Sequence, residues 1–163
     1  MYIKSQILIL ILLISISSCG FHLAGSGEFS SNLENTSVQG AASSRELVRY
    51  IEKHLKSNEI NIVGLSQASA VINILNEQTD RVVLSLDNDG KVREFELILN
   101  ITYDVKKADN TYMLKEQNIS INRDFVFNKT NLLGSDQEQQ NVYSEMRDDA
   151  AKVIVYRLQQ IPG

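Results

Sequence analysis

Residues 91–107 show a regular alternation of apolar and polar side chains. A period of two indicates a strand with one buried face and one solvated face. The buried face is predicted to carry Arg93, Phe95, Leu97, Leu99, Ile101, Tyr103 and Val105. The wet face is predicted to carry Glu94, Glu96, Asn100, Thr102 and Asp104.

Further strands are predicted on both sides of this one. Residues 68–75 and 81–86 predict either two segments or one long bent strand, and 112–128 predict another long strand. The turn at 87–90 is a hairpin signal, because an Asp89-Gly90 pair supplies the positive φ that a tight turn needs. A second turn is expected at 108–111, and a short strand around Val38.

Two segments have helical spacing instead. The first spans 44–57, with a capping box formed by Ser43 and Glu46 and apolar residues at Leu47, Val48, Ile51 and Leu55. The second is expected to begin near Asp136 and Glu138, where acidic groups favour the positive end of the helix dipole. Its apolar stripe consists of Val142, Met146, Ala150, Val153, Ile154 and Leu158.

These elements predict an α+β fold. Two helices must cover one face of the sheet to bury it, which gives a two-layer sandwich. The sheet is expected to be mostly antiparallel, with about four strands.

The N-terminus has the pattern of an export signal. Lys4 precedes an aliphatic run from Ile7 to Ile14, which is too short to span a membrane but suits a signal peptide. The residues Ile16-Ser17-Ser18-Cys19 resemble the bacterial lipobox. The resemblance implies a signal peptide over 1–18, lipidation of Cys19 and, since Gly20 is not aspartate, export to the outer membrane. A tether over 19–36 and a single domain over 37–163 follow.

Composition and motifs exclude several functions. The net charge of −4 disfavours general nucleic-acid binding. The sequence has no recognisable catalytic motif, and neither His22 nor His54 has a second ligand at metal spacing, so catalytic residues, metals and cofactors are not expected. The pair Glu94 and Glu96 fits the polar face of a strand better than an acid–base pair.

Two sets of basic residues leave alternatives open. Arg45, Arg49, Lys53 and Lys56 form a stripe along the first helix, which is either a solvated face or a contact for anionic groups. We favour the solvated face, because Glu52 can pair with Lys56. Arg123 lies in an apolar row, where it either pairs with a carboxylate across the sheet or points at a partner.

Several motifs together resemble one family. They are CGFHLAG after the lipobox, DGKVREFEL at the start of a long strand, NRDFVFN followed by LLGSDQEQ, and MRDDAAKVIVYRL near the end. Their order and spacing resemble the LptE family of lipopolysaccharide-assembly lipoproteins. The resemblance implies a small α+β domain that fills the lumen of the outer-membrane β-barrel LptD as a 1:1 plug and helps lipopolysaccharide reach the outer leaflet.

The resemblance also implies a location and candidate contacts. The protein would be lipid-anchored on the periplasmic side of the cell outer membrane. Lys91, Arg93, Arg123 and Lys129 are candidate contacts for lipopolysaccharide or for the barrel, and Asp89 and Gly90 shape the hairpin. The competing hypotheses are an independent outer-membrane lipoprotein that binds a lipid or glycan, and an envelope enzyme whose site has no familiar motif.

Overall fold

The computed structural model describes residues 29–127 and 132–161. The signal peptide predicted over 1–18, the lipidation predicted at Cys19 and the candidate contact Lys129 lie outside these residues. The helices are α2 (Arg45–Ser57) and α3 (Leu132–Leu158), with short 3-10 turns at Ser31–Leu33, Ala42–Ser44 and Leu65–Gln67. The strands are β1 (Asn35–Gly40), β2 (Asn61–Ile62), β3 (Ala70–Leu86), β4 (Val92–Lys107) and β5 (Tyr112–Val126).

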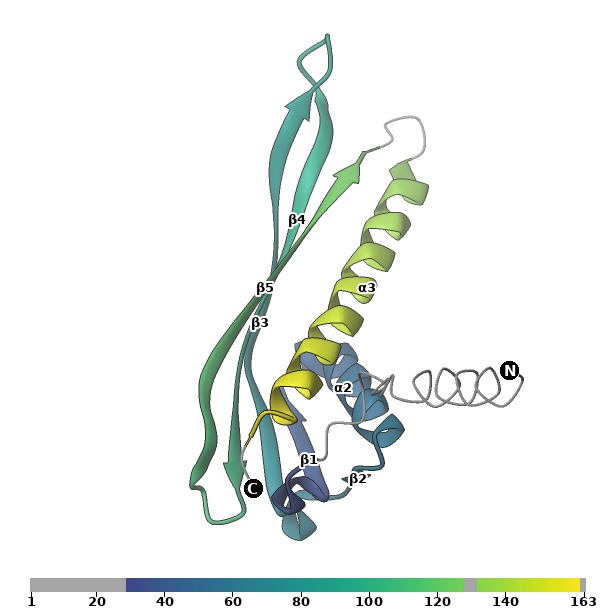
Figure 1. Cartoon of the computed structure of the whole chain (residues 1–163). Helices are drawn as coiled ribbons and strands as arrows, with labels where there is room; N and C mark the ends of the chain where they lie inside the picture. The colour runs from purple at the N-terminus through teal and green to yellow at the C-terminus, as the bar shows by residue number, and fades with distance from the viewer. Residues whose placement is uncertain (1–28, 128–131, 162–163) are drawn as a thin grey trace, which may run out of the picture.

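The five strands form one sheet in the order β2-β1-β3-β4-β5. The long strands β3, β4 and β5 form an antiparallel meander, and β1 is parallel to both β2 and β3. Both helices lie on the same face of this sheet (Figure 1). The predicted two-layer α+β sandwich is therefore confirmed, with five strands instead of about four and a parallel pairing at the short N-terminal strands.

β3 is a single long strand, so the second of the two sequence interpretations is correct. It pairs with β4 from Ala70 to Leu86, and the register shifts between Ile74 and Asn76. The shift leaves Leu75 unpaired as a bulge, which exchanges the faces of the residues from Asn76 to Val83, until the register shifts again between Val83 and Ser85. As a result Glu77 and Arg81 point toward the helices.

The core lies between the sheet and the two helices. The predicted inward residues of β4 from Leu97 to Val105 are buried, as are Leu47, Ile51 and Leu55 of α2. On α3 the buried apolar residues are Tyr143, Met146, Ala150, Ala151, Ile154, Val155 and Leu158. Val153, which was assigned to the apolar stripe of this helix, is instead exposed.

The folded part of the chain begins before the predicted boundary at residue 37. Leu33 is buried in the core, and β1 starts at Asn35. The Ser69 hydroxyl donates to the carbonyls of Asn32 and Asn35 at 2.8 and 2.9 Å, which fixes this segment against the start of β3. Residues 29–36 thus belong to the domain and not to a tether.

The ends of the helices differ from the prediction. Ser44 is the N-cap of α2 and makes no side-chain capping bond, so the expected capping box of Ser43 and Glu46 does not form. The Glu46 carboxylate instead accepts from Ser144 and Arg147 of α3. α3 begins at Leu132, earlier than the start expected near Asp136 and Glu138, so these two acidic residues lie beyond the first turn.

Asp104 also departs from the prediction. It lies on the strand face assigned to solvent, yet it is only 3% exposed. Asn73 donates to its carboxylate at 2.7 Å, and the Lys106 ammonium lies 3.5 Å away. These neighbours enclose the carboxylate and supply the partners that a buried charge requires.

Candidate functional site

The turn between β3 and β4 is organised by the Asp87 carboxylate. Its Oδ1 accepts from the backbone amides of Asp89 and Lys91 at 3.0 and 2.9 Å. Gly90 has a φ of +75°, and its amide donates to the Asp87 carbonyl at 2.9 Å. The sequence predicted the turn at 87–90 with Asp89 and Gly90 as the residues that shape it, and the structure adds the capping role of the Asp87 carboxylate.

Lys91 lies in the turn of this hairpin, and Arg93 lies at the start of β4 next to the turn, which we call the distal end of the meander. Both are exposed, and the Arg93 side chain is 65% accessible. The Arg93 Nε lies 3.9 Å from the Glu94 carboxylate, and its carbonyl accepts from the Phe127 amide at 2.9 Å. Arg93 therefore remains available to a ligand or partner.

Arg123 has a carboxylate partner, but on a helix and not across the sheet. Its Nη2 lies 2.6 Å from Asp149 Oδ2 of α3. Lys152 also donates to Asp149. The hydrogen bond from Lys152 and, after it, the one from Arg123 lower the pKa of the Asp149 carboxyl. Arg123 thus ties β5 to α3, while about half of its side chain stays accessible.

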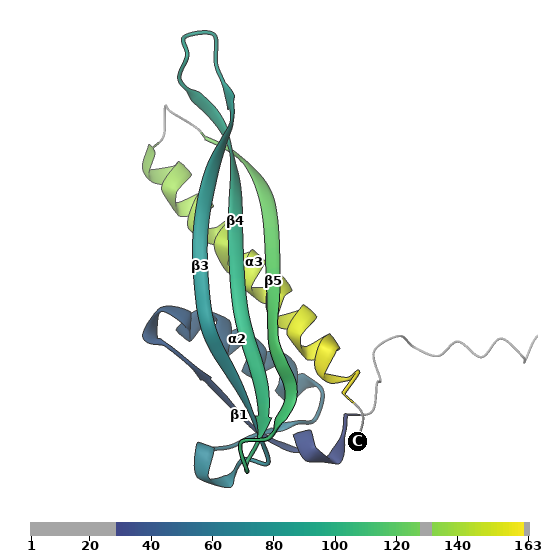
Figure 2. The ribbon, with the colours of Figure 1, turned by 90° about the vertical axis from the view of Figure 1, so that its left-hand side faces the viewer.

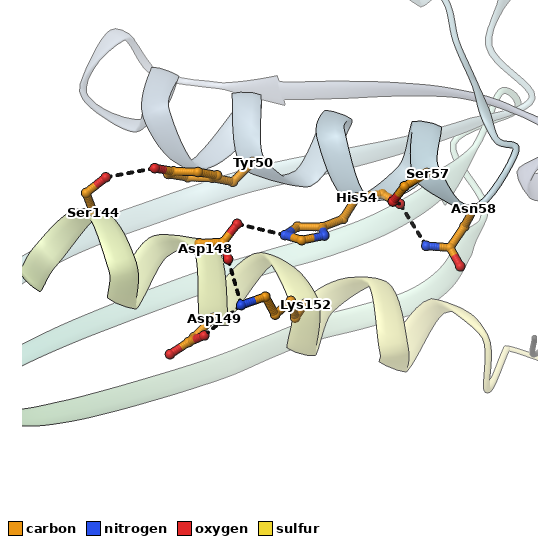
Figure 3. A network of polar contacts seen from close by, with 8 residues as sticks. All are labelled: Tyr50, His54, Ser57, Asn58, Ser144, Asp148, Asp149 and Lys152. Atoms are coloured by element: carbon orange, nitrogen blue, oxygen red, sulfur yellow. Dashed lines mark hydrogen bonds and ion pairs between the residues drawn. The ribbon is translucent and has the colours of Figure 1, made fainter. Parts of the chain in front are cut away.

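A polar network joins the two helices (Figure 3). Tyr50 Oη lies 2.8 Å from Ser144 Oγ, and His54 Nε2 lies 2.8 Å from Asp148 Oδ1. Lys152 approaches the other Asp148 oxygen at 2.6 Å. Hydrogen bonds from Lys152 and then His54 lower the pKa of the Asp148 carboxyl. His54 therefore links α2 to α3 through the Asp148 carboxylate.

A second, more buried cluster connects these helices to the sheet. Arg147 donates from Nε to Glu77 Oε1 at 2.7 Å and from Nη1 to Glu46 Oε2 at 3.2 Å. The Glu77 side chain is 3% exposed and the Arg147 side chain 14%. Glu77 and Arg147 are therefore partners of each other inside the domain, with a structural role.

The basic stripe of α2 is solvated. Arg45, Arg49, Lys53 and Lys56 are all exposed. Arg49 lies 3.7 Å from Glu46, and Arg49 and Lys53 approach the Tyr50 ring at 5.5 and 5.9 Å. These contacts support the interpretation as a solvated helix face.

Arg81 is a candidate that sequence reasoning missed. Leu97 of β4 is the cross-strand neighbour of both Arg81 on β3 and Arg123 on β5. The two arginines therefore lie on either side of Leu97 on the helix-facing side of the sheet. The Arg81 guanidinium lies 4.9 Å from the centre of the Phe95 ring, and its Nη1 donates to Gln139 at 3.3 Å. The signal was hidden because the bulge at Leu75 moves Arg81 to this side.

Neither helix covers the opposite side of the meander (Figure 2). We call this surface the open face and define it by the outward residues of β3, β4 and β5 between the level of Asn76, Thr102 and Asn118 and the level of Ser85, Glu94 and Val126. Their cross-strand pairing places Asn76, Gln78, Asp80, Val82, Ser85, Glu94, Glu96, Ile98, Asn100, Thr102, Asn118, Ser120, Asn122, Asp124 and Val126 on it. Polar contacts such as Thr102 to Asn118 at 2.8 Å follow the same pairing.

Residues 29–127 and 132–161 contain no cluster of three or more His, Cys, Asp or Glu side chains placed to hold a metal ion. In these same ranges, no helix has the length and apolarity needed to cross a bilayer.

Solved structures of similar fold come from bacterial lipoproteins. The crystal structure of rare lipoprotein B from Shewanella oneidensis matches with a TM-score of 0.66 and 26% identity, covering 77% of this chain and 94% of that one. The NMR structure of lipoprotein B from Nitrosomonas europaea matches with a TM-score of 0.67 and 25% identity, covering 87% and 90%. The chain therefore shares its α+β fold with bacterial proteins named as lipoproteins.

The family is set by the sequence match. The model of the family LptE: Lipopolysaccharide-assembly matches residues 32–158, and the chain belongs to this family. The LPS-assembly lipoprotein LptE of Photorhabdus laumondii is 27% identical over 95% of this chain and 86% of its own length. The protein of the same name from Pectobacterium atrosepticum is 28% identical over 90% and 80%.

Proposed function

We propose that this protein is a non-catalytic, lipid-anchored partner of the β-barrel LptD. It occupies the barrel lumen as a 1:1 plug and supports the passage of lipopolysaccharide to the outer leaflet. Lipid on Cys19 would hold it on the periplasmic side of the cell outer membrane. Two or more acyl chains give stable anchoring without a transmembrane helix.

The observation that carries this proposal is the family match over residues 32–158, which includes nearly the whole described fold. A role in lipopolysaccharide assembly comes with the family. The partner and the location are our extension of it, based on the resemblance in motif order described above.

The form of the domain supports a role as a plug. The lumen of a large membrane barrel is polar, so a guest needs a polar exterior and a core of its own. The core here is buried between sheet and helices, and the open face carries mainly amides, hydroxyls and carboxylates. A 17-residue β3 spans about 55 Å, which is long enough to follow the barrel axis through a bilayer of about 40 Å.

The distal arginines are the best candidates for a lipopolysaccharide contact. Arg81 and Arg123 lie on the helix-facing side, in one row with Leu97 between them. The Arg81 guanidinium lies 4.9 Å from the centre of the Phe95 ring, which is 5.9 Å from the centre of the Phe127 ring. Arg93 lies nearer the hairpin turn and is exposed. Guanidinium groups bind phosphate oxygens well, and the aromatic pair adds an apolar surface. Lys91, two residues before Arg93, and Lys129, six residues after Arg123, also remain candidate contacts for lipopolysaccharide or the barrel.

Co-purification tests the proposal. A tagged full-length protein is isolated from detergent-solubilised membranes of its own host, and the bound proteins are identified by mass spectrometry. We expect a β-barrel protein in the eluate in near-equal amount. A protein that elutes alone and folded would reject the plug, and specific lipopolysaccharide binding by that lone protein would favour an independent lipid- or glycan-binding lipoprotein.

A further inference from the structure

We propose that the open face is the surface through which this domain rests against the inner wall of its barrel partner. The occupant is a protein surface that presents lysine or arginine together with amide and hydroxyl groups. This inference rests on the proposed function, because it names the part of the plug that makes the contact. The opposite side, which carries the helices, then faces the part of the lumen that this domain does not fill.

The open face has the size that a stable interface needs. Three strands about 4.8 Å apart and about 15 residues long at about 3.3 Å per residue cover roughly 700 Å². A standard protein interface takes about 800 Å² from each partner. No described helix or loop of this chain covers the middle of this sheet (Figure 2).

Charge is distributed unequally between the two sides of the meander. Between the levels of Thr102 and Glu94 the open face carries Asp80, Glu94, Glu96 and Asp124 and no lysine or arginine; beyond Thr102 on the same side of β4, the Lys106 ammonium lies 3.5 Å from the buried Asp104 carboxylate. Arg81 and Arg123, which pair with Leu97 in the middle of these strands, lie on the helix-facing side. An exposed sheet face with one sign of charge selects a partner of the opposite sign.

The carboxylates are held mainly by neutral groups. Glu96 accepts from the Asn122 amide at 3.1 Å, and Glu94 accepts from the Ser85 hydroxyl at 2.6 Å. The guanidinium of Arg93 is 3.9 Å from Glu94 at the distal end of the strand. Neutral donors fix the carboxylates in place without cancelling their charge, so the charge stays available to lysine or arginine on a partner.

Lipopolysaccharide is a poor occupant of this face. Its phosphate groups are anionic, and like charges brought together at a contact are destabilising. The arginines on the other side are better placed for phosphates. The two sides of one sheet thus serve two different ligands.

Charge reversal in the full-length protein tests this assignment. The variant Glu96→Lys with Asp124→Lys changes the open face, and Glu52→Lys with Glu145→Lys makes the same change of charge on the helices. The barrel recovered with each tagged protein from solubilised membranes is then quantified. We expect about a tenfold loss for the open-face variant and a loss of less than about twofold for the helix variant.

The outcomes separate this inference from the proposed function. If the wild-type protein recovers no barrel, the proposed function fails. If the wild type recovers the barrel and the open-face variant does so equally well, or if the helix variant loses as much, the inference is wrong and the plug stands.

A milder variant keeps the test decisive if charge reversal prevents folding. Glu96→Gln with Asp124→Asn keeps the shape and hydrogen-bonding capacity of both side chains. We expect it to lose part of the barrel recovery and to become less sensitive to salt than the wild type, because the charge is removed. Unchanged recovery and unchanged salt sensitivity would contradict the inference.

Discussion

Arg147 of α3 and Glu77 of β3 form an ion pair with an Nε–Oε1 distance of 2.7 Å, and both side chains are mostly buried. Arg147 also reaches Glu46 of α2, so a single guanidinium connects three elements of the fold. Removing one member of such a pair leaves the other charge buried without compensation.

The first prediction concerns this pair. Arg147→Met is expected to lower the free energy of unfolding by about 3 kcal/mol, because Glu77 keeps its charge in a buried site. The double variant Arg147→Met with Glu77→Leu is expected to recover most of the loss, since both charges are then absent. Urea denaturation of the full chain in detergent measures both, and a double variant less stable than the single one would contradict this account.

The second prediction concerns the hairpin glycine. Gly90→Ala is expected to destabilise the protein by about 1 kcal/mol, because its φ of +75° strains any residue with a Cβ. A Cβ at this site would have no heavy atom within 4 Å, so backbone strain is the only cost.

Gly64→Ala is the matched control. Its added Cβ also meets nothing within 4 Å, but its φ is −68°. We expect no loss and a small gain in stability from this variant. Equal melting temperatures for the two variants would show that the turn conformation does not require glycine.

The third prediction concerns acid stability. Hydrogen bonds from Lys152 lower the folded-state pKa of Asp148 and Asp149. Their ionised forms therefore stabilise the fold fully above the unfolded pKa of about 3.9, and this stabilisation is lost as the pH falls through the lower folded values. Lys152→Met should raise both pKa values and flatten the loss of thermal stability in acid, whereas Lys56→Met on α2 should not.

Thermal unfolding followed from about pH 7 down to about pH 2 provides the measurement. An acid transition in the Lys152 variant that matches the wild type would show that these two carboxylates do not contribute to it.

The fourth prediction concerns the N-terminus. Mass spectrometry of the protein from its own membranes is expected to show a chain that starts at Cys19, with a diacylglyceryl group on the sulfur and an acyl group on the amine. Cys19→Ala should keep its leader and lose the lipid, because the sulfur is the attachment point. An unmodified thiol in the wild-type protein would reject the lipid anchor.

Much of the fold follows directly from local patterns in the sequence. The alternation over 91–107 identified the buried face of β4 because one side of that strand packs against apolar helices. The spacing of Leu47, Ile51 and Leu55 did the same for α2. Both patterns reflect burial against a neighbouring layer, which is encoded residue by residue.

Other features depend on contacts that no local pattern contains. The bulge at Leu75 exchanged the faces of the later part of β3, and a stretch read by simple alternation would place Arg81 on the wrong side. Glu46 was assigned to a capping box, but its carboxylate is taken by Ser144 and Arg147, which lie about a hundred residues away. β2 has only two residues, so its parallel pairing has no sequence signal.

The candidate site was predictable only in part. Arg123 was recognised as unusual from the sequence, and its expected partner was either a carboxylate across the sheet or a separate molecule. In the structure its partner is Asp149 of α3. The open face came from the pairing of three strands and not from any single segment. A surface of this kind becomes visible only when the register is known.

Native mass spectrometry of the complex purified from the protein's own outer membranes tests the central claim most directly. The account predicts one lipidated copy of this chain with one copy of a β-barrel protein, and no free folded chain after detergent exchange. A folded chain that is recovered alone, or that forms only assemblies with itself, would contradict the account.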